Sequence, residues 1–182
     1  LPSIFISKII LNNFRSHENF SIDANSSNVV LFGKNGVGKT NILESISLLS
    51  PGRGLRNAKN EEIINKKSGI NYSLSADLKL NDSSVKIKKF FVKDNSNKSN
   101  LLIDDEKSKT SELLNFLRVI WVTPVMEKIM LQSNSERRNF FDRLIFNIEK
   151  KHLKSFSAYN KFTKERLHIL KSNNIDDGWL QQ

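Results

Sequence analysis

Four residues have the types and spacing of a phosphate-binding loop, G-x-x-x-x-G-K-[ST]: Gly33, Gly38, Lys39 and Thr40, with a further glycine, Gly36, inside the loop. The glycines let backbone N–H groups approach phosphate oxygens, and the lysine supplies a charge for the β- and γ-phosphates. The threonine hydroxyl is placed to ligate Mg²⁺. We therefore predict a triphosphate site with Mg²⁺ on Thr40, built from Gly33, Lys34, Asn35, Gly36, Val37, Gly38, Lys39 and Thr40.

The segments beside this loop have the pattern that such a site needs. The apolar run 28–32 precedes it and predicts a strand, and the run 41–49 follows it with helical periodicity. The positive end of that helix would face the phosphates. We expect one apolar helix face, formed by Ile42, Leu43, Ile46 and Leu49. A glycine turn before an ordinary helix is the alternative interpretation.

Composition limits the classes of protein that fit. The chain has 182 residues, a net charge of +10 and no cysteine, which excludes disulfides and thiolate metal sites. Its three histidines lack ligand spacing, so we assign them no metal. No apolar run is long enough for a membrane span, and the first residues lack a secretory pattern, which favours the cytoplasm. The charge indicates either a polyanionic partner or only a lysine-rich composition, with 21 lysines against 8 arginines.

Apolar runs and alternation predict the sheet. Strands are expected at 4–11 and around 20–22, and strict alternation at 72–80, with runs at 85–92 and 101–103, predicts an antiparallel insert at about 70–104. Lysines on this insert either contact DNA or protect a strand edge, and we favour protection. The run 119–122 predicts a central parallel strand, and residues 123–127 after it are a candidate second nucleotide contact.

The helical segments predict a second domain. Short helices are expected at 60–64 and 110–114, and longer ones at 135–148 and 150–171. The apolar stripe of the 135–148 helix is assigned to a core rather than to base stacking: Phe140, Phe141, Leu144, Ile145 and Ile148. We predict an ATP-binding head over 1–132 and the truncated start of a helical lobe or arm over 133–182.

Five arginines are candidates for binding a nucleotide, DNA or a partner. Arg15 lies in a turn before the loop and is either a cation near the nucleotide or a surface residue. Arg53 and Arg56 lie in a glycine-rich link after the loop's helix and either face phosphate or are solvated. Arg137 and Arg138 begin a later helix, where cations oppose the dipole, which indicates a phosphate or carboxylate partner.

Four stretches together resemble a known family: 11–15, 33–45, 52–56 and 137–143. The chain resembles the N-terminal half of the RecF family, bacterial DNA replication and repair proteins of the SMC-like ABC ATPase group. The first two stretches are shared across that group, and the last two, at their separation, are typical of RecF. The chain departs from the pattern at Val125, where many members have an acid, and at Ser133-Asn134, where a glycine is usual.

The resemblance implies an α/β fold, an ABC-type ATPase head with a mixed sheet. It implies ATP-dependent dimerisation on double-stranded or gapped DNA, with RecO- and RecR-type partners and loading of the recombinase RecA after DNA damage, in the nucleoid. It places Arg15 near the nucleotide. The family's signature motif, Walker B acid and catalytic glutamate are expected beyond residue 182, so we name no catalytic residue and expect weak DNA-dependent ATPase activity only in a longer protein.

Two other functions fit the loop. One is another SMC-like head, of the SbcC type or the overcoming-lysogenisation type, which would be followed by a longer coiled coil or a nuclease domain. The other is a P-loop phosphotransferase, which would carry a substrate lid instead of a basic helical arm. DNA binding that strengthens with ATP would favour the two SMC-like interpretations.

Overall fold

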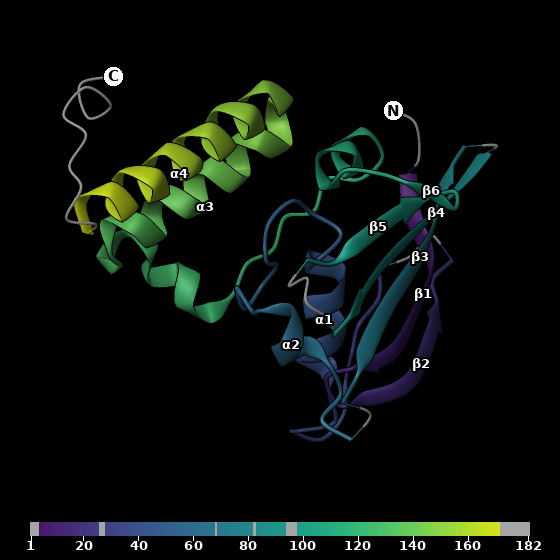
Figure 1. The fold of residues 1–182 in the computed structure, drawn as a ribbon. Coiled ribbons are helices and arrows are strands. Elements are labelled where there is room, and N and C mark those ends of the chain that lie inside the picture. Colours follow the sequence, from purple (N-terminus) through teal and green to yellow (C-terminus); the bar gives the residue numbers. More distant parts are fainter. Residues whose placement is uncertain (1–3, 26–27, 68, 82, 94–97, 172–182) are drawn as a thin grey trace. The chain divides into compact units, whose positions relative to one another are not determined.

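The computed structural model describes residues 4–25, 28–67, 69–81, 83–93 and 98–171. The chain divides into two compact units, Leu1–Trp121 and Val122–Gln182. The first unit contains the β-sheet and the second is helical (Figure 1).

The first unit is built on a six-stranded sheet with the order β2-β1-β3-β4-β5-β6. Every neighbouring pair in that sheet is antiparallel, and the ladder between β1 and β3 contains a register shift between Ile6 and Lys8. The strands are β1 (Ile4–Phe14), β2 (His17–Asp23), β3 (Asn71–Leu80), β4 (Ser83–Val92), β5 (Asn100–Ile103) and β6 (Glu106–Lys107). The strands and the antiparallel insert that the sequence predicts between residues 4 and 104 are therefore confirmed, except for the run 28–32.

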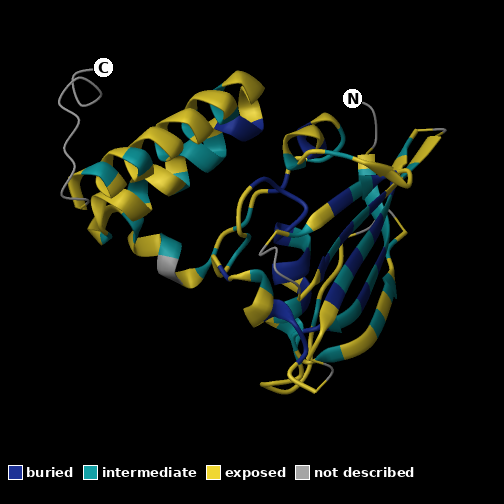
Figure 2. Cartoon of the chain, viewed as in Figure 1, coloured by how far each residue is buried: buried dark blue, intermediate teal, exposed yellow. Residues whose placement is uncertain are grey.

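Alternation along the strands explains which sheet face is buried. In β3, Tyr72, Leu74, Ala76 and Leu78 are all buried, and the residues between them are partly exposed (Figure 2). Phe14 ends β1 fully buried, with its ring edge-on to Tyr72 at 5.7 Å between centroids. The face therefore forms one apolar surface on which the helices can pack.

Helices α1 (Lys39–Ser47) and α2 (Asn60–Ile63) lie over one face of this sheet (Figure 1). Ile42 and Leu49 are buried and Ile46 packs against the core, but Leu43 is 52% exposed. The predicted apolar face was therefore wrong at Leu43, because only one side of a helix that lies on a sheet is covered. The short helix predicted at 110–114 is the 3₁₀ helix η1 (Thr110–Asn115).

Two predicted strands do not form in the described part of the chain. Residues 28–32 and 119–122 have no strand conformation, and Phe32 is 91% and Val122 is 78% exposed. An apolar run supplies strand propensity, but a strand also needs a neighbour for its backbone hydrogen bonds. No described strand pairs with either run, so the expected parallel core is absent here, while the α/β class with its antiparallel sheet is confirmed.

The second unit contains η2 (Pro124–Leu131), α3 (Asn134–Ile148) and α4 (Lys150–Lys171), the last with the bounds predicted from sequence. Ser133 caps α3 in a reciprocal capping box with Glu136. Phe146 is buried, with its ring 6.2 Å from that of Phe156 on α4. None of the helices in the described ranges is long and apolar enough to cross a membrane.

The apolar stripe predicted for α3 is only partly a core. Phe141, Ile145 and Ile148 are exposed within this unit, whereas Phe146, which was not assigned to the stripe, is buried. Two packed helices can cover only the side of each that faces the other, so a wider stripe stays outside. The assignment of these three side chains to a core was therefore wrong for the unit described here.

Candidate nucleotide-binding site

The phosphate-binding loop occupies residues 33–38 and leads directly into α1. Gly33, Gly36 and Gly38 have φ values of 144°, 88° and 100°. Such positive values are rare for residues with a Cβ, so the loop's path depends on glycine. Gly38 is the N-cap of α1, which places the helix's positive end at the loop.

Lys39 holds the loop together from inside. Its ammonium group donates hydrogen bonds to the carbonyl oxygens of Gly33 and Lys34, both at 2.8 Å. A charged donor on two carbonyls is a strong pair of hydrogen bonds, and it fixes the curvature of the loop around the lysine. The loop therefore curves around a positive charge, and its predicted contact with phosphate stays a prediction.

Gly38 is also where the loop meets the turn between β1 and β2. A Cβ at this position would lie 2.5 Å from His17 Nε2 and 2.7 Å from Ser16 Oγ, so no other residue fits without movement. Asn41 in the first turn of α1 donates to Ser16 Oγ at 2.9 Å. The β1–β2 turn therefore forms one wall of the phosphate-binding loop.

A buried carboxylate braces α1 from the same side. Glu44 has no exposed surface and accepts two hydrogen bonds from Arg15, Nη2 to Oε1 at 2.6 Å and Nε to Oε2 at 2.9 Å. Arg56 donates to Oε2 of the same carboxylate at 2.8 Å and to Asn41 Oδ1 at 2.8 Å. The bidentate geometry of the Arg15 pair is the arrangement in which a guanidinium binds a carboxylate best.

The backbone of Arg15 explains how its side chain reaches α1. Its φ is 54°, in the left-handed region, and its amide donates to the carbonyl of Ile63 at 2.7 Å. Its Nη1 donates to the carbonyl of Glu62. Arg15 thus ties the β1–β2 turn, α1 and α2 together, and its predicted contact with a nucleotide stays a prediction.

Glu44 is the residue of this site that sequence reasoning missed. Its partners are 29 and 12 positions away along the chain, so no local pattern connects them. One signal in the sequence could have indicated it. Glu44 is an acid within the apolar pattern of α1, and Arg15 and Arg56, on either side of it in the sequence, had no assigned partner.

The other candidate arginines lie elsewhere. Arg53 is exposed in the link after α1, where it lines a cavity that the phosphate-binding loop does not share. Arg137 and Arg138 belong to the second unit, where Arg137 donates to Asn134 Oδ1. Arg138 donates to the Tyr159 hydroxyl at 2.5 Å and lies 5.2 Å from the centre of that ring. Their roles toward DNA or a partner stay predictions.

The residues of the loop fit a metal ion only together with phosphate. Thr40 is exposed in the first turn of α1, where its hydroxyl is available as a single oxygen ligand. Among the described residues, no group of three histidine, aspartate or glutamate side chains could hold a metal ion. Since Mg²⁺ usually keeps waters and phosphate oxygens beside one or two protein ligands, Thr40 suits a nucleotide-bound ion.

Known proteins resemble this chain in both sequence and fold. RecF of Rickettsia bellii is 35% identical and RecF of Rickettsia akari 36% identical, over all of this chain and 50% of each relative. The chain thus spans about half the length of the curated relatives it matches. The structure of the recombination mediator RecF with ATP, from the RecFOR pathway, has a TM-score of 0.80 and 26% identity over 98% of this chain and 50% of that one.

A broader likeness supports the fold alone. The SMC head bound to the C-winged helix domain of ScpA is 21% identical, with a TM-score of 0.59, over 85% of this chain and 54% of that one. The family model described as the RecF/RecN/SMC N-terminal domain matches residues 5–126. The resemblance to RecF found in the motifs is thereby confirmed, and the chain belongs to the RecF/RecN/SMC N-terminal domain family.

Proposed function

We propose that this chain is the ATP-binding half of a RecF-type protein of DNA replication and repair. The observation that carries the proposal is Lys39, whose ammonium group is held between the carbonyls of Gly33 and Lys34 at the start of α1. An ammonium placed in a glycine loop is positioned for phosphate oxygens before any ligand arrives.

The chemistry of binding follows from this geometry. Phosphate oxygens compete with the two carbonyls for Lys39 and accept hydrogen bonds from loop amides, which Gly36 and Gly38 allow to come close. Thr40 would supply a hydroxyl to Mg²⁺, and the bound ion would neutralise part of the phosphate charge. The Arg15 brace holds α1, and with it the direction of these groups, fixed.

Glu44 is unsuited to the role of hydrolytic base. A base must reach a water at the terminal phosphate, whereas this carboxylate is fully buried and engaged by two guanidinium groups. We therefore propose that Glu44 holds α1 in place and takes no part in ATP hydrolysis.

The wider function is proposed from the family and the charge. ATP would bring two heads together on double-stranded or gapped DNA, with RecO- and RecR-type partners, to assist recombinase loading. The net charge of +10 suits a polyanionic partner. We propose a head over 1–132 and the start of an arm over 133–182, with Arg53, Arg56, Arg137 and Arg138 as candidate contacts and the cytoplasmic nucleoid as the location.

The test compares ATP binding by two lysine variants, one in the loop and one outside it. Replacing Lys39 by alanine removes the charge from inside the loop, and we expect ATP affinity, measured by titration calorimetry with Mg²⁺, to fall more than about tenfold. Lys79→Ala removes the same charge from an exposed position on β3, outside the loop, and is expected to change affinity less than about twofold. Equal, small effects of the two changes would refute a phosphate-binding role for the loop.

A further inference from the structure

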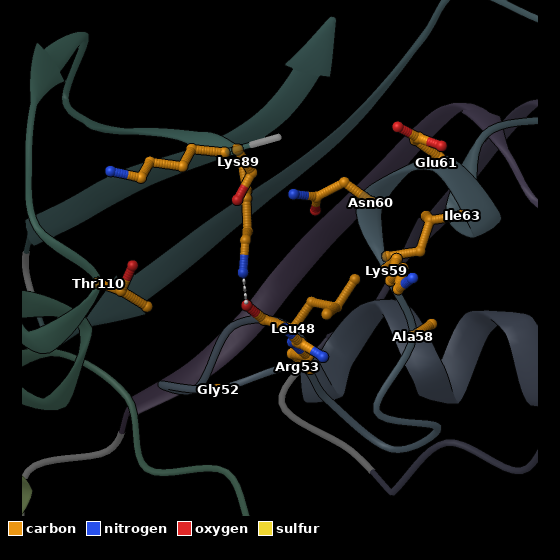
Figure 3. Close-up of a pocket in the computed structure, with 12 residues that line it drawn as sticks. Leu48, Gly52, Arg53, Ala58, Lys59, Asn60, Glu61, Ile63, Lys89 and Thr110 are labelled. Atoms are coloured by element: carbon orange, nitrogen blue, oxygen red, sulfur yellow. Dashed lines mark hydrogen bonds between the residues drawn. The ribbon is translucent and has the colours of Figure 1, made fainter. Parts of the chain in front are cut away.

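A cavity of about 550 Å³ lies in the first unit and shares no lining residue with the phosphate-binding loop. It is lined by the link after α1, helix α2, Lys89 of β4, the segment before β5 and the first residue of η1 (Figure 3). Its volume is within the range of small-molecule sites and exceeds that of one inorganic phosphate.

The charge around this cavity is strongly positive. Four cations line it, against the single carboxylate of Glu61: Arg53, Lys59, Lys89 and Lys98. The neutral polar residues Asn60 and Thr110 also line it, and the Asn60 side chain extends toward Lys89 (Figure 3). Such a lining attracts anions and offers them additional hydrogen-bonding groups.

Lys89 is the residue that distinguishes this cavity from an ordinary basic surface. It lies between Ile87 and Phe91 on the buried face of β4 and is itself only 5% exposed. Its ammonium group donates to the Leu48 carbonyl at 3.1 Å (Figure 3). Within the described part of the chain, no carboxylate forms an ion pair with Lys89.

Among the described residues, the ammonium of Lys89 exchanges water for one carbonyl oxygen and no carboxylate, and burying a charge with so little compensation is costly. Burial lowers the pKa of Lys89 to about 8, because removing water disfavours the charged form of the amine. An apolar residue at this position would fit between Ile87 and Phe91 without the desolvation cost. The simplest explanation for the amine is therefore that it contacts an anion bound in the cavity.

We propose that this cavity binds the phosphate group of a small anion, from pyrophosphate to a mononucleotide in size, with Lys89 as the buried contact. Arg53 at the rim supplies a guanidinium that can engage two phosphate oxygens at once, and Lys59 adds a third positive charge. The proposal does not depend on the phosphate-binding loop and goes beyond the ATP-binding function proposed above.

The experiment removes the loop site first. Pyrophosphate is titrated into the Lys39→Ala chain by calorimetry, and we expect saturable binding at one site. Adding Lys89→Met, which keeps the length of the side chain but not its charge, is expected to weaken that binding more than about tenfold. Adding Lys86→Met instead removes the same charge from an exposed position of the same strand and is expected to leave affinity within about twofold.

The outcomes separate the possible ligands. Similar effects of Lys89→Met and Lys86→Met would show that only net charge matters and would overturn the proposal. Binding of a short DNA duplex, with no binding of pyrophosphate or AMP, would assign the cavity to a nucleic acid backbone and also overturn it. If the Lys89→Met chain did not fold, Arg53→Ala at the exposed rim provides the test, with an expected loss of about three- to tenfold.

Discussion

Two buried charges in the first unit are treated in opposite ways by the chain around them. Glu44 has no exposed surface and is engaged by two guanidinium groups of the same unit. Lys89 is 5% exposed and has one carbonyl oxygen as its hydrogen-bond acceptor. The first charge is compensated by the fold, and the second lies at a cavity whose other cations add to it.

The difference separates a structural charge from a candidate ligand-binding charge. Breaking a compensated buried pair leaves one ion without its partner, which destabilises the fold. Removing an uncompensated buried ion removes its desolvation cost, which stabilises the fold. It also abolishes the binding of any ligand that the ion contacts. The two sites should therefore respond to mutation with opposite signs.

The largest effect is expected when the structural pair is broken. Arg15→Ala leaves the Glu44 carboxylate buried with only Arg56, and we expect the free energy of unfolding to fall by about 3 kcal/mol. Urea denaturation followed by circular dichroism measures this. The control is Lys8→Ala, which breaks the exposed Lys8–Asp23 pair and should cost less than about 1 kcal/mol. Equal losses in the two variants would refute the bracing role.

The next effect has the opposite sign. Lys89→Met is expected to raise the free energy of unfolding at pH 7 by about 2 kcal/mol, because it removes a desolvated ammonium and gives up one hydrogen bond. Thermal and urea unfolding of wild type and variant at the same protein concentration provide the measurement. A loss of stability would mean that the fold itself needs the amine.

The same residue predicts a pH dependence. Burial lowers the pKa of Lys89 to about 8, below the roughly 10.4 of an unfolded lysine. Below pH 8 the amine is protonated in both states and its full cost is present. Between about pH 8 and 10 the unfolded chain binds more protons, so wild-type stability should rise relative to Lys89→Met and the gap between them should close. Burial also raises the pKa of Tyr72, so the titration of that hydroxyl changes stability only above about pH 10.

The smallest effect is expected at Arg56, the second arginine that contacts Glu44. The Arg56 side chain is 41% exposed, so Arg56→Ala removes a partly hydrated contact while the bidentate Arg15 pair remains. We expect a loss of about 1 kcal/mol by urea denaturation. A loss as large as that of Arg15→Ala would show that both guanidinium groups are needed to hold Glu44.

The features that sequence predicted well are those set by neighbouring residues. Alternation at 72–80 gave β3 and its buried face, helical periodicity gave α4 with its bounds, and the glycine spacing gave the loop that leads into α1. Each depends on residues a few positions apart, whose side chains share a face or whose φ values glycine allows.

The features that sequence did not predict depend on distant partners. The runs 28–32 and 119–122 have strand propensity, but no described strand pairs with them. Phe141 has the period of a core residue, yet it is exposed because α4 covers only one side of α3 within the second unit. Pairing and coverage are properties of the assembled fold, so periodicity alone cannot decide them.

The sequence by itself therefore determined the phosphate-binding loop, the antiparallel strands and the family resemblance, because each is recorded in local spacing. Only the tertiary structure decided that Arg15 and Arg56 meet on Glu44, and that Lys89 lies on a buried face beside three other cations. Whether a charge is compensated depends on which distant segments surround it, and that arrangement exists only once the chain has folded.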